Sequence, residues 1–150
     1  MATAATLPHR SGVCEPPGVA LFTVRASRVG LTTVPVDGVV YGPNNLNGLI
    51  DETGAASPPE VGDASSGASV ERIDIAGAWQ IQAVPTPGTW TQGTPPPPPA
   101  EGLLLSEVFY DVDGSDDGFE WVELHNSGSA TIDLAAFSLA YGGTSYANPL

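Results

Sequence analysis

The feature that most restricts the fold of this chain is a run of five consecutive prolines, Pro95 to Pro99. Such a run favours polyproline II, which rises about 3.1 Å per residue, and it cannot continue a helix. Residues 89–102 are therefore predicted to be a proline-rich linker between two folded parts. Gly 18 and Pro 15 together make about 22% of the 150 residues, and both disfavour helices, so the folded parts are expected to be all-β.

The charge of the chain is strongly one-sided. There are 17 Asp and Glu residues and 4 basic residues, which gives a formal net charge of -13. Such a surface repels phosphate backbones and anionic lipid headgroups, so the sequence predicts no nucleic-acid partner. No stretch approaches the ~20 apolar residues of a membrane span. The single cysteine, Cys14, excludes an intrachain disulfide.

Alternation of apolar and polar residues predicts strands before the linker. These strands are expected at 19–25, 32–41, 69–75 and 78–84, with the first two forming a hairpin. Residues 43–67 are rich in Gly, Pro, Ser, Asn and Asp, and they are expected to be a long disordered loop. Residues 1–17 are small and proline-rich, which predicts an unstructured lead-in.

The same alternation resumes after the linker. Strands are expected at 103–110, 119–126, 131–134 and 137–141, with an acidic turn over 111–118. A β-sandwich needs about seven strands, and three or four are expected here, so this part is predicted to be an incomplete domain.

Motifs on both sides of the linker resemble one known family. After the linker, the motifs Leu104-Leu105-Ser106-Glu107-Val108, Glu120-Trp121-Val122-Glu123-Leu124 and Ile132-Asp133-Leu134 follow one another. This series resembles the opening half of a bacterial lamin-tail domain, over 103–146. Before the linker, the family's closing half is similar to Val36-Asp37-Gly38-Val39-Val40-Tyr41-Gly42, Ser69-Val70-Glu71-Arg72, Trp79 and Pro85-Thr86-Pro87-Gly88, over 18–88.

The resemblance implies an immunoglobulin-like β-sandwich of the kind found in secreted or surface proteins of bacteria, often in tandem and often attached to hydrolase domains. It implies no catalytic residues. Residues 18–88 are then the C-terminal part of one lamin-tail-like domain, and residues 103–150 are the N-terminal part of a second. Alternatively, the two parts form one permuted sandwich. On the first interpretation, the chain is a fragment whose two ends lie inside domains.

The segment from Asp111 to Gly118 is the sharpest candidate site. Carboxylates at alternate positions with glycines among them are typical of calcium loops. The candidate calcium ligands are Asp111, Asp113, Asp116 and Asp117. However, the distal Glu of an EF-hand is not at its expected spacing, and Asp and Gly equally suit a hairpin turn. The turn is the favoured interpretation, and no other cofactor is expected.

An acid–base pair of the glycoside hydrolase type is a further candidate, drawn from Glu107, Glu120 and Glu123. Strand alternation argues against it, because Glu120 and Glu123 are three residues apart and point to opposite faces. The only histidines, His9 and His125, are too few for a typical zinc site. We therefore predict that the chain is not an enzyme.

Three tryptophans, Trp79, Trp90 and Trp121, raise the possibility of a carbohydrate-binding platform. Such a platform needs two coplanar exposed rings, whereas aromatic residues in strands usually pack against neighbours. Packing is the favoured interpretation for Trp79 and Trp121.

Taken together, these features predict a structural, adhesive or tethering module of a secreted or cell-surface bacterial protein. The expected partners are a protein or cell-surface component and the neighbouring domains of the same parent chain. Two alternatives stay open: a calcium-stabilised ligand-binding module, and an accessory domain of a larger secreted hydrolase. The extracellular location follows from the resemblance alone, because this stretch encodes no signal peptide.

Overall fold

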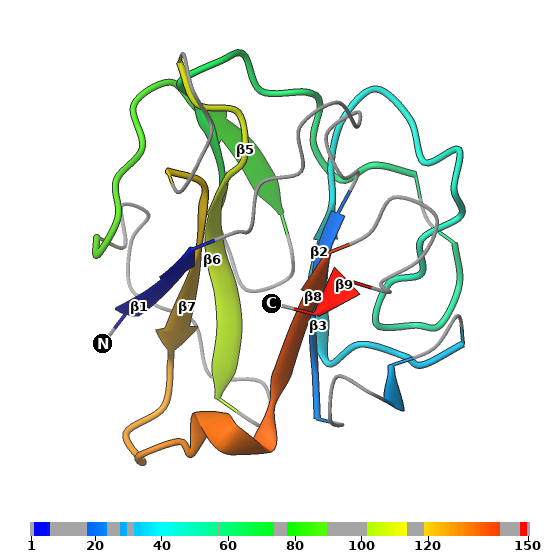
Figure 1. The fold of residues 1–150 in the computed structure, drawn as a ribbon, viewed down its shortest axis with the longest axis vertical. Coiled ribbons are helices and arrows are strands. Elements are labelled where there is room, and N and C mark those ends of the chain that lie inside the picture. The colour runs from blue at the N-terminus through cyan, green and yellow to red at the C-terminus, as the bar shows by residue number, and fades with distance from the viewer. Residues whose placement is uncertain are drawn as a thin grey trace. The chain divides into compact units, whose positions relative to one another are not determined.

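Short strands separated by turns dominate the structure, as expected for a chain rich in Gly and Pro. The computed structural model describes residues 2–6, 18–23, 28–29, 32–56, 58–73, 78–89, 102–113, 119–141 and 148–149. Within these ranges the chain forms nine strands, β1 to β9, and the 3-10 helix η2, Leu134–Ala136 (Figure 1). Neighbouring strands pair antiparallel throughout and form two sheets, so the predicted all-β class is confirmed.

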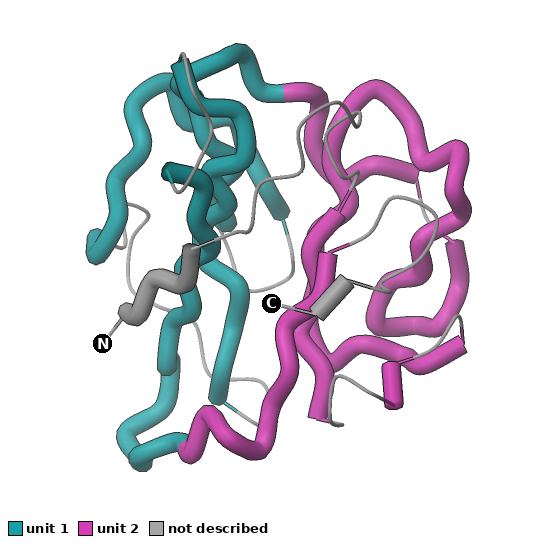
Figure 2. The backbone as a smooth tube through the Cα atoms, viewed as in Figure 1, with its two compact units in different colours: residues 1–9, 64–132 teal, residues 10–63, 133–150 magenta. Residues whose placement is uncertain are grey.

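Each sheet belongs to one of two compact units (Figure 2). Unit 1, teal in Figure 2, comprises residues 1–9 and 64–132, and its sheet has the order β1-β7-β6-β4-β5. Its strands are β1 Ala2–Thr6, β4 Ser69–Arg72, β5 Trp79–Gln82, β6 Leu103–Phe109 and β7 Trp121–Asn126. Val70, Val108 and Val122 are cross-strand neighbours and are fully buried. One face of this sheet is therefore apolar across its three central strands.

Unit 2, magenta in Figure 2, comprises residues 10–63 and 133–150. Its sheet has the order β3-β2-β8-β9, with β2 Gly18–Phe22, β3 Asp37–Val40, β8 Ser138–Tyr141 and β9 Asn148–Pro149. The buried core of this unit contains Ala20, Phe22, Val40, Leu49 and Ala140. Gly38 lets β3 approach β2 closely, because a Cβ there would lie 3.3 Å from the Val19 carbonyl oxygen.

The hairpin predicted near the start of the chain is confirmed. β2 pairs with β3 from Gly18 opposite Val40 to Leu21 opposite Asp37. β3 begins five residues later than the strand predicted over 32–41. Pro35 has no N–H to donate, and the pairing with β2 begins only after it, with the Val36 N–H donating to the Leu21 carbonyl at 2.8 Å.

Residues 43–67, predicted as a long disordered loop, instead make specific contacts. The Asn45 side chain brackets Leu49, since Nδ2 donates to the Leu49 carbonyl and Oδ1 accepts from the Leu49 N–H, both at 2.9 Å. Leu49 is buried in the core of unit 2. Glu60 N–H also donates to the Val40 carbonyl at 2.8 Å. The few apolar residues of this segment that pack, Leu49, Ile50 and Ala64, are scattered among polar ones and give no periodic pattern, so the sequence did not reveal this order.

Both sheets combine strands from before and after the proline-rich segment. In unit 1, β4 pairs with β6 through Val70 opposite Val108 and Glu71 opposite Glu107. In unit 2, β2 pairs with β8 along the whole of β8. Strands assigned from the sequence to two separate domains therefore share ladders. Within residues 1–17, predicted as an unstructured lead-in, β1 Ala2–Thr6 instead pairs with β7, and residues 7–17 lie outside the described part. The boundaries at 18–88, 89–102 and 103–150 stay predictions, and residues 90–101 also lie outside the described part.

Candidate functional site

Three buried glutamates form a row across the middle of the sheet of unit 1. Glu71 on β4 lies opposite Glu107 on β6, and Glu107 lies opposite Glu123 on β7. Residues directly opposite one another in an antiparallel ladder point to the same face, so the three side chains are neighbours. They are only 4%, 2% and 3% exposed, respectively. We call Glu71, Glu107 and Glu123 the glutamate row.

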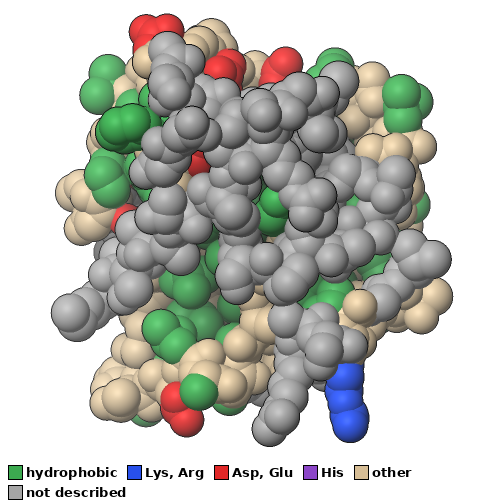
Figure 3. Space-filling view, in the orientation of Figure 1, with side chains coloured by type: hydrophobic (Ala, Val, Ile, Leu, Met, Phe, Trp, Pro, Cys, Tyr) green, Lys and Arg blue, Asp and Glu red, His purple; other side chains and the backbone are tan. Residues whose placement is uncertain are grey.

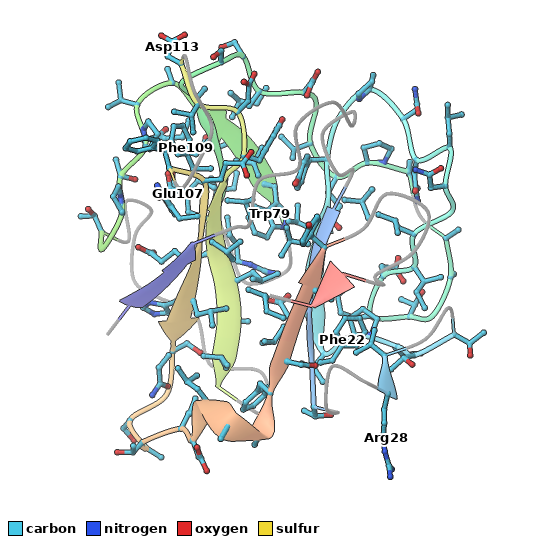
Figure 4. The ribbon with its side chains drawn as sticks, viewed as in Figure 1. Phe22, Arg28, Trp79, Glu107, Phe109 and Asp113 are labelled. Atoms are coloured by element: carbon cyan, nitrogen blue, oxygen red, sulfur yellow. The ribbon has the colours of Figure 1, made fainter. Side chains whose placement is uncertain are left out.

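A β-bulge at Ser106 creates this row. The register passes from Leu105 opposite Leu124 directly to Glu107 opposite Glu123, which leaves Ser106 as an extra residue on β6. If β6 continued from Leu105 without a bulge, Ser106 would lie opposite Glu123, and Glu107 would lie opposite Val122 and point to the apolar face. In Figure 4, Glu107 and Phe109 extend to the same side of β6. The bulge therefore places the Glu107 carboxylate on the face of Glu123, opposite to the apolar face that carries Val108 and Val122.

Serine hydroxyls donate to two members of the row. Ser106 Oγ donates to Glu123 Oε1 at 2.7 Å and also lies 3.2 Å from the Glu123 carbonyl oxygen. Ser69 Oγ, on β4, donates to Glu107 Oε1. Gln80 Nε2 lies 3.4 Å from Glu71 Oε2. Buried carboxylates need such donors, because an unsatisfied charge in a buried site is strongly destabilising.

Backbone amides of the segment after β5 complete the site. Thr86 N–H donates to Glu107 Oε1 at 3.1 Å, and Gly88 N–H donates to Glu123 Oε2. Gly88 has a φ of 80°, a left-handed conformation that favours glycine. Thr89 N–H then donates to the Thr86 carbonyl at 3.1 Å. We call residues 85–89 the closing turn, since it binds the row through its own backbone.

Burial is the main influence on the protonation of Glu107. Burial raises the pKa of Glu107 above its usual value of 4.5. The hydrogen bonds from Ser69 and Thr86 act in the opposite direction, while the negative charges of Glu71 and Glu123 raise the pKa further. On β7, burial lowers the pKa of His125.

The other face of β4 holds a buried cation. Arg72 is 3% exposed, its guanidinium lies 4.9 Å from the centre of the Trp79 ring, and its Nε donates to the Leu105 carbonyl at 2.9 Å. Trp79 Nε1 is buried and has no hydrogen-bond partner among the described residues. Trp79 is 7% exposed, so it packs, as the sequence favoured.

The aromatic residues of unit 1 do not form a flat exposed pair in the described part. Phe109 and Trp121 lie 5.7 Å apart with their rings tilted by 40°. This angle does not give the coplanar rings that a carbohydrate-binding platform requires. Trp90 lies outside the described residues.

The predicted calcium ligands are only partly described. The Asp111 carbonyl accepts from Gly67 N–H at 2.7 Å, and Asp113 Oδ1 accepts from Ser66 Oγ at 3.2 Å. Asp116 and Asp117 lie outside the described residues. Among the described side chains, no group of three or more His, Cys, Asp or Glu is arranged to hold a metal ion. On the face shown in Figure 3, acidic side chains are spread among neutral ones.

The sequence identified two members of the row but not their arrangement. Glu107 and Glu123 were considered with Glu120, but Glu120 lies before β7 begins and outside the row. The sequence pattern does not identify Glu71 as a site residue, because the pairing of its strand with β6 is long-range. The available signal was a Ser close to a Glu in two strands, Ser69 two residues before Glu71 and Ser106 directly before Glu107. His9 lies outside the described residues.

Comparisons with known proteins returned no matching family model, no matching curated protein and no matching solved structure. In the described part of the chain, no helix has the length and apolar character needed to cross a membrane.

Proposed function

We propose that this chain is a non-catalytic structural, adhesive or tethering module of a secreted or cell-surface bacterial protein. The proposal rests on one observation, which is how two buried carboxylates are hydrogen-bonded. Glu107 and Glu123 accept hydrogen bonds from the backbone amides of Thr86 and Gly88. Carboxylates used in this way hold a scaffold together, and this use supports a structural role over an acid–base role.

We also propose that the module is an immunoglobulin-like sandwich of the lamin-tail type in permuted order. Its Ser-Glu and Glu-Trp-Val-Glu-Leu motifs resemble the family's opening half, and its Pro-Thr-Pro-Gly motif resembles the closing half. Hydrogen bonds between these motifs support the proposal, since both halves contribute to one sheet unit. The pairing of β2 with β8 supports it in the other unit. The proposed partners are a protein or cell-surface component and neighbouring domains of the parent chain.

A tethering module must carry load between its ends. We would stretch the full chain between terminal handles in an optical trap. We expect discrete unfolding steps and refolding on relaxation, because antiparallel ladders join residues from both parts of the chain. A Glu107→Ala, Glu123→Ala variant should unfold at lower force, while Glu52→Ala, a change of an exposed glutamate, should behave as the parent chain. Smooth extension without discrete steps would exclude a folded tether.

A second candidate function is calcium-stabilised ligand binding, which is motivated by the spacing of Asp111, Asp113, Asp116 and Asp117. A calcium titration followed by calorimetry and by thermal melting tests it. If calcium binds, heat and a rise in melting temperature are expected in the parent chain and are lost in the Asp111→Asn, Asp113→Asn variant. No heat and no shift in the parent chain would leave the structural module as the sole proposal.

A further inference from the structure

The turn that precedes Leu49 in unit 2 contains an asparagine followed by a glycine, Asn47-Gly48. Both residues are exposed. Gly48 N–H donates to the Asn45 carbonyl at 3.2 Å, which closes the turn, and Gly48 has a φ of 64°, a left-handed conformation that suits glycine. A Cβ added at Gly48 would meet only the Ala56 Cβ, at 4.0 Å, so little of the protein covers this residue.

The side-chain amide of Asn47 is free, whereas those of two other asparagines are held. Asn47 makes no hydrogen bond through its side chain within the part of the chain that the structure describes. Asn45, by contrast, binds both main-chain groups of Leu49. Asn126 donates to one main-chain group at 2.8 Å and accepts from another at 3.0 Å. Asn47 therefore combines a mobile amide with an unobstructed glycine after it.

An asparagine in this setting can react with the backbone that follows it. The Gly48 nitrogen loses its proton to water and attacks Cγ of Asn47. The N–Cγ bond forms, the Cγ–Nδ2 bond breaks, and Nδ2 takes up a proton from water and leaves as ammonia. The product is a cyclic succinimide, whose closure is favoured because Gly48 has no side chain to obstruct it. Water then opens the ring at either carbonyl and gives aspartate or isoaspartate, with no oxidation or reduction.

The isoaspartyl product changes the main-chain path that leads to Leu49. In this product the main chain runs through the former side chain, so the path from Asn45 to Leu49 gains one carbon atom. The two 2.9 Å hydrogen bonds between these residues span that path. Leu49 is 2% exposed and belongs to the core of unit 2. A longer path misplaces both bonds and the buried leucine with them, whereas the aspartyl product keeps the path length.

We propose that Asn47 is a site of spontaneous deamidation, and that its isoaspartyl product releases Leu49 from the core of unit 2. The reactants are the chain itself and water. The site needs only the local geometry of the turn, so it does not depend on the tethering function proposed above.

Peptide mapping of the aged full chain tests the site. The chain would be incubated at neutral and at mildly alkaline pH, and each asparagine followed by mass spectrometry with fragmentation that distinguishes aspartate from isoaspartate. We expect conversion of Asn47, faster at the higher pH because the attacking nitrogen must lose a proton. Asn126 should be converted at least about tenfold more slowly, because two hydrogen bonds must break first. Equal conversion of both, or an intact Asn47 while a synthetic peptide of residues 43–52 is converted, would overturn the proposal.

The separated products test the effect on Leu49. Ion exchange isolates the isoaspartyl and aspartyl forms, and amide hydrogen exchange is measured on each. In the isoaspartyl form, protection of the Leu49 amide should fall by about tenfold or more, since both bonds to Asn45 are lost. The aspartyl form should match the parent chain, as should the Gly67 amide of unit 1, which donates to the Asp111 carbonyl. Unchanged Leu49 protection in the isoaspartyl form would overturn the release of this residue.

Two variants complete the design. Asn47→Gln keeps an exposed amide but must close a larger ring, so it should fold as the parent chain and keep its Leu49 protection during ageing. Asn44→Gln makes the same chemical change at a neighbouring exposed asparagine that no glycine follows, and it should age as the parent chain does. Loss of Leu49 protection in aged Asn47→Gln at the parent rate would assign the loss to another position and overturn the proposal.

Discussion

Ser69 contributes a hydroxyl to the least exposed member of the glutamate row. It is itself fully buried, and its Oγ donates to Glu107 across the β4–β6 ladder. Hydrogen bonds to a charged group contribute about 1.5–3 kcal/mol, more than those between neutral groups. Ser69 should therefore contribute far more to stability than serines with exposed partners.

Ser69→Ala is expected to lower the free energy of unfolding by about 1–3 kcal/mol, because Glu107 loses a buried donor. The same change should raise the pKa of Glu107 further, since the Ser69 hydrogen bond holds it down. Urea denaturation and carboxyl NMR titration measure the two effects. Ser66→Ala, which removes a donor to Asp113 at an exposed contact, is the matched control and should change stability by about 0.5 kcal/mol or less. Equal effects of the two variants would contradict this ranking.

Glu107 also makes the free energy of unfolding of the whole chain depend on pH. Because burial raises its folded-state pKa above 4.5, its contribution is fully present below that pH and is lost as the pH rises through the raised value. The free energy of unfolding should thus fall with rising pH in this window. Glu107→Gln should flatten this part of the profile in urea denaturation, whereas Glu52→Gln should keep it. His125, whose pKa burial lowers, adds a rise of its own as the pH approaches 6.5, so the comparison with the variant decides: identical profiles of the parent chain and Glu107→Gln would refute the assignment.

Among the elements, β6 has one feature that the sequence predicts, its extent, and one that it does not, the bulge at Ser106. Its extent was predicted over 103–110, and the strand covers Leu103–Phe109, because its apolar run and the flanking Gly102 are local signals. The bulge at Ser106 was not predicted, since an extra residue becomes visible only against the partner strand. The glutamate row depends on that bulge and on pairing across many residues. The strands could thus be predicted from the local sequence pattern. The site could not, because it depends on which residues of neighbouring strands lie opposite one another.

Deleting Ser106 should leave the pairing of β6 intact. The shorter strand can pair Leu105 with Leu124 and Glu107 with Glu123 in a regular ladder, so the glutamate row is kept, but Glu123 loses the hydroxyl that donates to its Oε1. We expect a loss of about 1–3 kcal/mol in the free energy of unfolding, measured by denaturation, because a buried carboxylate loses a donor. Deletion of Ser129, in the exposed segment after β7, is the control and should cost less. A loss well above about 3 kcal/mol would show that the bulge itself is required for the ladder.

For the whole molecule, the principal feature is that both sheets draw strands from both sides of residues 89–102. β4 pairs with β6 in unit 1, and β2 pairs with β8 in unit 2. The sequence raised this arrangement as an alternative to two separate half-domains, but it contained no signal to choose between them. The choice depends on long-range partners, and local alternation does not specify those.

A cut within the proline run tests this pairing. We would replace Pro95 to Pro99 with a protease recognition site and cleave the folded chain. The two pieces are expected to elute together at the size of the uncut chain, because the ladders of both units hold them. The uncut variant is the control. Separate elution of the pieces, or aggregation after cleavage, would favour two independent half-domains.

The pairing of early strands with late ones also determines when the chain can fold during synthesis on the ribosome. β2 and β4 are made early, yet β6 and β8, which pair with them, follow residue 102. At about 5–20 residues per second, the first part waits for several seconds with open strand edges before its partners are translated. A nascent chain stalled before β6 should accordingly stay sensitive to protease, and protection should arise only after β8 has left the exit tunnel.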